Sequence, residues 1–171
     1  MSSSTSLSLG MGPLGLFSAS PTHRFAAPAA FLGWGWLYAY CVLASRTWKQ
    51  WYGIDHNGSP RQDLTKYADV AVREGKITRA QVDQLRRVEA ASANATEGYT
   101  LFVASVLFAL VTDVPRSSLI NACTTYTVAR LVYGAVYVFV EDDFWSQARG
   151  ISWWTGNISC LFLLWKGAQS V

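Results

Sequence analysis

The chain has 171 residues, of which 51% are hydrophobic, 14% are aromatic and only 15% are charged. Soluble domains carry about 25% charged residues, and one small domain would struggle to bury so much apolar surface, so a membrane protein is the better class. The net charge of +3 does not favour a nucleic-acid partner, because nine of the 14 Lys and Arg residues fall between residues 46 and 87 together with five acids. A nucleic-acid surface more usually shows an unopposed basic stripe.

The cysteines and histidines predict neither disulfides nor a metal site. Cys41, Cys123 and Cys160 form no CxxC pair and are odd in number, so we expect buried free thiols. His23 and His56 lie far apart and show no metal-ligand spacing.

The N-terminal part of the chain divides into a polar tail and an apolar segment. Residues 1–24 are rich in Ser, Gly and Pro and lack the basic start of a signal peptide, which predicts a disordered tail before a membrane domain over residues 25–171. Residues 25–45 contain no charge and meet the requirement of about 20 residues for a membrane-crossing helix. Trp48 and Trp51, beside Arg46 and Lys49, predict an interfacial belt at its far end.

A second, longer helix follows the turn-rich residues 52–76, which we expect to form a polar loop. Thr78 and Gln81 have the spacing of a capping box, which predicts a helix to about Val111. Such a helix would be roughly 50 Å long, against a hydrocarbon core of about 30 Å. Its first turns should therefore stand in water, with Asn94 and Glu97 just inside the membrane.

Two further helices complete the prediction of an all-α bundle of four transmembrane helices in up-down order. After a short turn at residues 113–116, a helix is expected over about 117–140, with Arg130 on one stripe with Tyr126, Tyr133 and Tyr137. A connector carrying Arg149 should lead into the last helix, over about 150–165.

The distribution of basic residues predicts the orientation. The face that holds residues 46–87 and Arg149 has ten Lys or Arg residues and the opposite face has three. The first and third loops should therefore be cytoplasmic and both termini luminal. The glycosylation sequons at Asn57, Asn94 and Asn157 would then lie in the cytoplasm or within helices, so we expect none to be used.

Polar side chains from three of the predicted helices form a candidate site at the cytoplasmic end. Its members are Arg87, Asn94 and Glu97, which share one face of the second helix, together with Arg130, Tyr133, Tyr137 and Arg149. They supply cations for carboxylates, an acid for an ammonium group and phenols for hydrogen bonds, which suits a small zwitterionic or anionic ligand beside an apolar cleft. The alternative is an internal network in which Glu97 pairs with Arg130 and needs no ligand.

The chain resembles the MAPEG superfamily, the membrane-associated proteins of eicosanoid and glutathione metabolism, most closely its fungal-type members. The resemblance rests on four motifs, WYGIDHNGSPR, RRVEAASANATEGYTLF, ARLVYGAVYV and ARGISWW, which span about residues 30–166. It implies a homotrimer with sites between protomers, where glutathione meets a lipophilic electrophile from the membrane.

The same resemblance assigns roles to the candidate residues. Asn94, Glu97, Arg130, Tyr133 and Tyr137 match positions that hold glutathione, and Arg149 matches the arginine thought to stabilise its thiolate. Arg87 would help to position the peptide.

The resulting expectation is a glutathione-dependent transferase, peroxidase or isomerase, multi-pass in the endoplasmic reticulum membrane, acting on a lipophilic substrate. Two alternatives stay open: a glutathione-independent isomerase or cyclase of a lipophilic secondary metabolite, and a non-catalytic membrane binding protein.

Overall fold

The computed structural model describes residues 24–170, and the regular elements within that range are all helices. Its long elements are α1 (Ala26–Leu37), α4 (Arg79–Val111), α5 (Arg116–Phe139) and α6 (Asp143–Ala168). The all-helical prediction is therefore confirmed, whereas the tail predicted for residues 1–24 lies outside the described residues except for Arg24.

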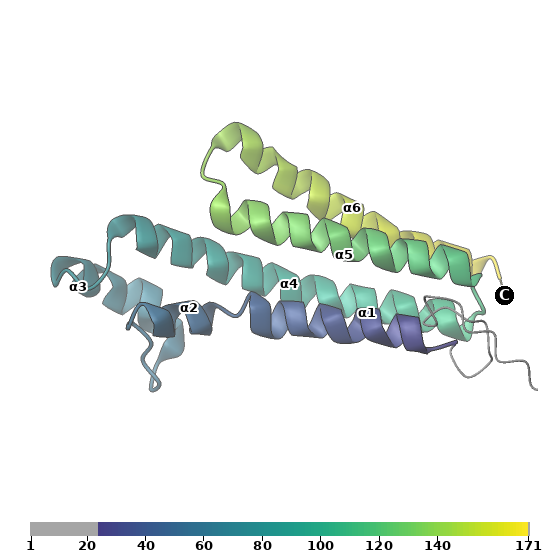
Figure 1. Cartoon of the computed structure of the whole chain (residues 1–171), viewed down its shortest axis with the longest axis horizontal. Helices are drawn as coiled ribbons and strands as arrows, with labels where there is room; N and C mark the ends of the chain where they lie inside the picture. Colours follow the sequence, from purple (N-terminus) through teal and green to yellow (C-terminus); the bar gives the residue numbers. More distant parts are fainter. Residues whose placement is uncertain (1–23, 171) are drawn as a thin grey trace, which may run out of the picture.

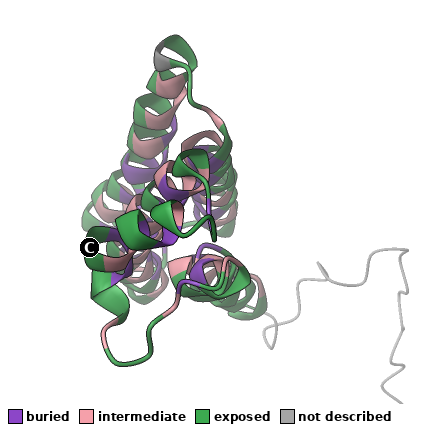
Figure 2. Ribbon diagram, turned by 90° about the vertical axis from the view of Figure 1, so that its left-hand side faces the viewer, coloured by how far each residue is buried: buried purple, intermediate pink, exposed green. Residues whose placement is uncertain are grey.

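The long helices run side by side, with α1 along α4 and the α5–α6 hairpin beside them (Figure 1). The short elements α2 and α3 lie at one end of the molecule, and the α4–α5 turn and the C-terminus lie at the other. The core between α4, α5 and α6 includes Phe102 and Tyr126, whose rings stack with centroids 4.0 Å apart. Buried residues face one another across the helices, and exposed residues cover their outer sides (Figure 2).

Helix α4 begins where the sequence predicts. The Thr78 hydroxyl accepts a hydrogen bond from the Gln81 backbone N–H at 3.3 Å, and the Gln81 side chain accepts one from the Thr78 N–H at 2.7 Å. This reciprocal capping box satisfies two N–H groups at the helix start. The helix then runs unbroken for 33 residues.

The first helix is less regular than its composition indicates. After α1, the chain forms a π-helical turn, η3 (Tyr38–Val42), and breaks at the extended Ala44 before α2 (Ser45–Trp51). The Tyr38 hydroxyl donates a hydrogen bond to the Arg130 carbonyl at 2.9 Å, which fixes this turn against α5. The prediction of one continuous helix over residues 25–45 is thus wrong at its C-terminal end. A π-helical turn often marks a functional position.

Residues 60–73 fold into short helical elements, so the prediction of a polar loop over residues 52–76 is wrong for this stretch, while residues 52–59 and 74–76 are turns and loops. The helical elements are η4 (Pro60–Gln62), η5 (Asp63–Tyr67) and α3 (Ala68–Arg73). Their apolar side chains form a separate core with the start of α4, made of Ile54, Leu64, Ala68, Ala71, Ile77, Val82 and Leu85. At the edges of this region Gly53 and Gly75 take positive φ values of 68° and 71°, and a turn at Asn57 and Gly58 is closed by a hydrogen bond from the Ser59 N–H to the His56 carbonyl at 3.0 Å.

The last helix starts seven residues earlier than predicted, at Asp143 instead of Gly150. Asp142 caps it by accepting a hydrogen bond from the Trp145 N–H at 3.0 Å. Arg149 therefore lies inside the helix and not at its opening.

The exposure of side chains bears on the predictions of buried cysteines and of membrane-crossing helices. Cys123 and Cys160 are buried free thiols as expected, but Cys41 is exposed. Two segments of the described chain, Ala26–Trp51 and Arg79–Val111, are long and apolar enough to cross a membrane by length and composition. Large apolar side chains are exposed along the outer faces of the helices, among them Trp36, Val111, Ile151 and Trp154.

Candidate functional site

A row of alternating cationic and aromatic side chains joins α5 to α6. The Arg149 guanidinium lies 4.7 Å from the ring centroid of Tyr137, whose ring is 5.3 Å from that of Tyr133. The Arg130 guanidinium lies 5.6 Å from the Tyr133 centroid on one side and 5.3 Å from the Tyr126 centroid on the other. The spacing on α5 predicted this stripe, and α6 adds Arg149 to its end.

Arg149 is half-buried and keeps most of its donors unused. Its Nε donates to the Ser146 carbonyl of its own helix at 3.2 Å. Among the side chains that the structure describes, none forms an ion pair with Arg149, and none is hydrogen-bonded to the hydroxyls of Tyr133 and Tyr137. A cation beside two phenols therefore remains available to an acceptor from outside the protomer.

Arg87, by contrast, forms an ion pair with another residue of the protein. One of its terminal nitrogens (Nη2) lies 2.6 Å from Glu141 Oε1, which links α4 to the α5–α6 turn. The Glu141 side chain is 69% exposed, so solvent screens this pair and it is weak enough to exchange for a ligand carboxylate.

Asn94 and Glu97 stand apart from the row. Both lie on α4, Asn94 half-buried and Glu97 exposed. In the described part of the chain, neither makes a hydrogen bond or ion pair to α5 or α6. The internal Glu97–Arg130 pair, which was the alternative to a ligand site, is not formed in this structure.

Arg130 is more deeply buried than we expected for a residue that binds glutathione. The residue is 4% exposed, and all three guanidinium nitrogens are buried without an acceptor among the described residues. Gly98 of α4 makes the room: a Cβ at that position would lie 1.3 Å from Nη2 of Arg130.

An apolar groove of about 490 Å³ lies between α5 and α6, next to Arg149 in sequence. Its lining from α6 includes Ala148, Ile151 and Ser152, and its lining from α5 includes Val128 and Val132. Such a surface suits a lipophilic molecule close to the Arg149 end of the row.

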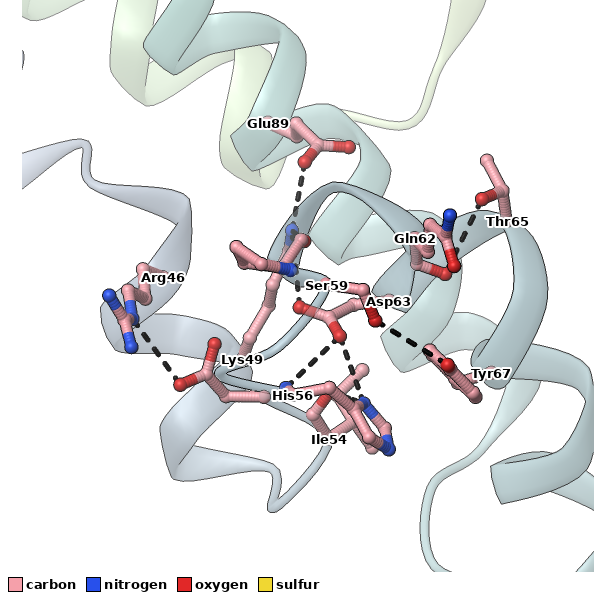
Figure 3. Close-up of polar contacts among 12 residues, drawn as sticks. Arg46, Lys49, Ile54, His56, Ser59, Gln62, Asp63, Thr65, Tyr67 and Glu89 are labelled. Carbon is pink, nitrogen blue, oxygen red and sulfur yellow. Dashed lines mark hydrogen bonds and ion pairs between the residues drawn. The ribbon is translucent and has the colours of Figure 1, made fainter.

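A second polar cluster, which was not predicted, holds residues 52–76 against the bundle (Figure 3). Lys49 is 3% exposed, and its ammonium group lies 2.9 Å from Glu89 Oε1, 3.1 Å from the Pro60 carbonyl and 3.8 Å from Asp63. The fully buried Asp63 also accepts hydrogen bonds from the backbone N–H of His56 at 3.1 Å and from its ring at 2.9 Å.

The rim of this cluster is aromatic and exposed to solvent. The His56 ring stacks on Tyr67 with centroids 4.0 Å apart. A hydrogen bond to Ser59, and next the charge of Lys66, lower the pKa of the Tyr67 hydroxyl from its ordinary value. Every buried charge in the cluster has an opposite partner, so the arrangement is that of a structural clamp.

Comparison with protein families decides the class of the molecule. The family model described as MAPEG family matches residues 25–169. The chain belongs to the MAPEG family. No significant match was found among curated proteins or among solved structures.

MAPEG membership makes the chain one of a family of membrane proteins of eicosanoid and glutathione metabolism. It agrees with the two apolar segments long enough to cross a bilayer. The matched range contains both the row on α5 and α6 and the clamp around Lys49.

The sequence did not predict five residues whose role depends on contacts between distant parts of the chain. Lys49, Asp63 and Glu89 form the clamp although they are far apart in sequence. Gly98 leaves room for the Arg130 guanidinium, and Tyr38 donates a hydrogen bond to the Arg130 carbonyl. The motif WYGIDHNGSPR pointed to the clamp region without indicating its burial.

Proposed function

We propose that this MAPEG protein is a membrane enzyme that uses glutathione to conjugate, reduce or isomerise a lipophilic substrate. The observation that carries the proposal is the end of the row at Arg149, Tyr137 and Tyr133. There a guanidinium and two phenols keep hydrogen-bonding capacity that no described residue uses. Family membership supports glutathione as the partner, and the adjoining apolar groove supports a lipophilic substrate.

The proposed chemistry is activation of the glutathione thiol. A cation close to a thiol lowers its pKa and raises the fraction present as thiolate, which is the nucleophile. Arg149 is the residue proposed for this task. Its stacking on Tyr137 at 4.7 Å restrains the guanidinium without consuming its terminal N–H donors.

The remaining candidates are proposed to hold the peptide. Asn94 offers an amide and Glu97 a carboxylate for an ammonium group, while Tyr133 and Tyr137 offer phenols. Arg87 can bind a carboxylate after leaving its exposed partner Glu141.

Arg130 enters this proposal only as a positive charge behind Tyr133. Its nitrogens are enclosed, and they reach a ligand in the cleft only if the guanidinium moves.

The proposal places the protein in the endoplasmic reticulum membrane. There α1 with its continuation to Trp51, α4, α5 and α6 cross in up-down order. Residues 52–76 and the α5–α6 turn are proposed to face the cytoplasm. The support is the concentration of basic residues at that end of the helices.

A homotrimer is the proposed assembly, and the exposed face of α4 supports it. Glu97 is an exposed carboxylate within a segment apolar enough to cross a membrane, which is costly unless protein or water covers it. Ala93, Thr100 and Ala104 flank it on the same exposed face, and small residues let another helix approach closely. A second copy would thus complete the site. Native mass spectrometry that finds only monomers would contradict this part.

Calorimetric titration of the detergent-solubilised protein with glutathione tests the function. We expect saturable heat for the wild type and weaker binding for Arg149→Gln. Arg86→Gln is the matched control, because Arg86 is an exposed arginine whose ion pair is with Asp83 of its own helix, and it should bind like the wild type. Absence of heat at millimolar glutathione would contradict the proposal.

A glutathione-independent isomerase or cyclase is the second candidate, and one observation favours it. Cations able to meet two carboxylates are few near Arg149, because Arg87 pairs with Glu141 and Arg130 is enclosed. Ala90 and Ala93 occupy the intervening surface of α4. If glutathione does not bind, comparing metabolite extracts with and without the protein separates this enzyme from a non-catalytic binding protein, which would leave the profile unchanged.

A further inference from the structure

The turn before η4 presents the dipeptide Asn57-Gly58 to solvent. Both residues are exposed, and the turn is closed by the hydrogen bond from the Ser59 N–H to the His56 carbonyl. A Cβ built on Gly58 meets nothing within 4 Å, so the backbone is open on this side. Asparagine is a thermolabile residue, because the backbone nitrogen of the next residue can attack its side-chain amide. A glycine in that next position removes the steric barrier to the attack.

Two groups that take part in this attack are unengaged in the turn. In the described structure no hydrogen bond uses the Gly58 N–H, which has to lose its proton when the nitrogen attacks. The Nδ2 of Asn57, which leaves as ammonia, likewise has no acceptor among the described residues. Neither the nucleophile nor the leaving group therefore has to break a hydrogen bond first.

The side-chain oxygen of Asn57, by contrast, is held by a cation. Nη2 of Arg46 donates a hydrogen bond to Asn57 Oδ1. The same guanidinium is fixed through its Nε, which donates to Asp55 Oδ2 at 3.3 Å, and that carboxylate oxygen also accepts a hydrogen bond from Gln50 at 3.2 Å. A donor on a carbonyl oxygen stabilises the oxyanion that forms when a nucleophile adds to the carbon. Arg46 therefore activates the amide that lies next to Gly58.

We propose that Asn57 is a site of spontaneous deamidation, in which Arg46 assists the attack by Gly58. The Gly58 nitrogen forms a bond to Cγ of Asn57, the Cγ–Nδ2 bond breaks, and ammonia leaves with the proton that the Gly58 nitrogen has lost. The product is a succinimide, which water opens. Opening at Cγ gives aspartate, and opening at the backbone carbonyl gives isoaspartate, in which the main chain runs through the former side chain. The sum of the steps consumes water and releases ammonia, so no oxidant or other co-reactant is needed.

Isoaspartate at this position acts on the clamp, because the turn joins two of its anchors (Figure 3). His56 donates to Asp63 through its backbone N–H at 3.1 Å and its ring at 2.9 Å, and the Pro60 carbonyl lies 3.1 Å from the Lys49 ammonium group. Isoaspartate adds a methylene group to the main chain between these anchors. The two anchors then no longer fit their partners together, so the modification should loosen the segment that they hold.

The test is peptide mapping by mass spectrometry during incubation of the detergent-solubilised protein at mildly alkaline pH. We expect Asn57 to convert, with isoaspartate as a product that an isoaspartyl methyltransferase labels from S-adenosylmethionine. The other asparagines, Asn94, Asn121 and Asn157, are internal controls, because they lie within α4, α5 and α6, where the following N–H is bound in the helix. Conversion of Asn57 no faster than theirs would overturn the proposal.

A variant of the glycine tests the attack itself. Gly58→Ala should slow the conversion of Asn57 by about tenfold or more, which corresponds to about 1.4 kcal/mol in the activation free energy. The variant should fold, because the added Cβ meets nothing within 4 Å and the backbone of Gly58 is not in the left-handed region. An unchanged rate would overturn the mechanism.

A variant of the arginine tests the assistance. Arg46→Met should slow the conversion by a few fold, less than the loss of an enclosed oxyanion donor, because the guanidinium is exposed. Arg79→Met, which removes an exposed arginine paired with Asp69, should convert like the wild type. In urea, Arg46→Met and the wild type should convert equally, because the contact exists only in the folded protein. Equal or faster conversion of folded Arg46→Met would overturn the role of Arg46.

Hydrogen exchange tests the effect on the clamp. We expect faster exchange across residues 54–63 in the aged wild type than in the fresh protein, and no such change in aged Gly58→Ala. Asn57→Asp carries the new charge on an ordinary main chain, so its exchange should stay close to that of the fresh wild type. Unchanged exchange in protein that contains isoaspartate would overturn the effect on the clamp. These measurements use no glutathione, so their outcome is independent of the proposed function.

Discussion

Two cations, Lys49 and Arg130, are buried in this chain, and they differ in whether nearby oxygen atoms accept hydrogen bonds from them. Lys49 is 3% exposed and has two oxygen acceptors, Glu89 at 2.9 Å and the Pro60 carbonyl at 3.1 Å, with the Asp63 carboxylate as a further ion-pair partner at 3.8 Å. Arg130 is 4% exposed and has no acceptor among the described residues. Burial of a cation is therefore no sign of function by itself. What distinguishes the two regions is whether the chain supplies the acceptors.

The same distinction separates the two arginines nearer the surface. Arg87 is paired with Glu141 at 2.6 Å, whereas Arg149 stacks on Tyr137 and has no acid beside it in the described structure. We therefore interpret Lys49 as a residue that holds elements together and Arg149 as a cation that is available to a ligand. Arg87 lies between the two, because its exposed pair with Glu141 can exchange for a ligand carboxylate.

Removing the Lys49 charge should have the largest effect. In Lys49→Met, Asp63 and Glu89 lose their cation, and breaking a buried pair costs about 3–5 kcal/mol. We expect fast hydrogen exchange across residues 54–77 and a loss of global stability. Arg79→Gln is the control, because it breaks an exposed pair with Asp69, and unchanged exchange in Lys49→Met would show that the clamp is not structural.

Gly134→Ala should come next, because it disturbs the anchor of the Arg130 backbone. A Cβ on Gly134 would lie 1.9 Å from the Tyr38 hydroxyl oxygen, and the rigid ring cannot yield without losing its hydrogen bond to the Arg130 carbonyl. Overpacking of this kind costs about 1–3 kcal/mol. Chemical denaturation is the measurement. Gly33→Ala, where the added Cβ meets nothing within 4 Å, should not destabilise the protein.

Gly98→Ala should have a smaller effect on stability and a clear effect on the guanidinium. The added Cβ would collide with Nη2 of Arg130, the end of a flexible side chain, so we expect the arginine to swing away at a cost of about 1 kcal/mol. Chemical denaturation is the measurement and Gly150→Ala, which meets nothing within 4 Å, is the control. Stability equal to that of Gly150→Ala would mean that Arg130 does not fill this space.

The exposed Asp69–Arg79 pair should show the smallest effect. A hydrogen bond from Arg79, and next its charge, hold the pKa of Asp69 below its usual 3.8. A carboxyl whose folded pKa is depressed contributes stability above its unfolded pKa and loses it as the pH falls through the folded value. NMR titration of the Asp69 carboxyl should give a pKa closer to 3.8 in Arg79→Gln. An identical pKa in both proteins would show that the pair does not form in solution.

Features encoded by residues close in sequence were predicted well. Features that depend on contacts between distant residues were not. The capping box at Thr78 and the stripe of Arg130 with its tyrosines are encoded by residues close in sequence, and both were predicted correctly. The α6 start was placed too late because the cap at Asp142, which begins the helix at Asp143, was not considered. The clamp was missed because Lys49, Asp63 and Glu89 meet only after the chain folds.

The most direct test of the central claim, that Arg149 keeps its donors for a thiolate, is the ultraviolet absorbance of bound glutathione as a function of pH. The wild type should show thiolate absorbance at a pH where free glutathione shows none, because the guanidinium stabilises the anion. Arg149→Gln should require a higher pH for the same signal, while Arg86→Gln should match the wild type. Equal thiolate titration curves for the wild type and Arg149→Gln, with glutathione bound to both, would contradict the account.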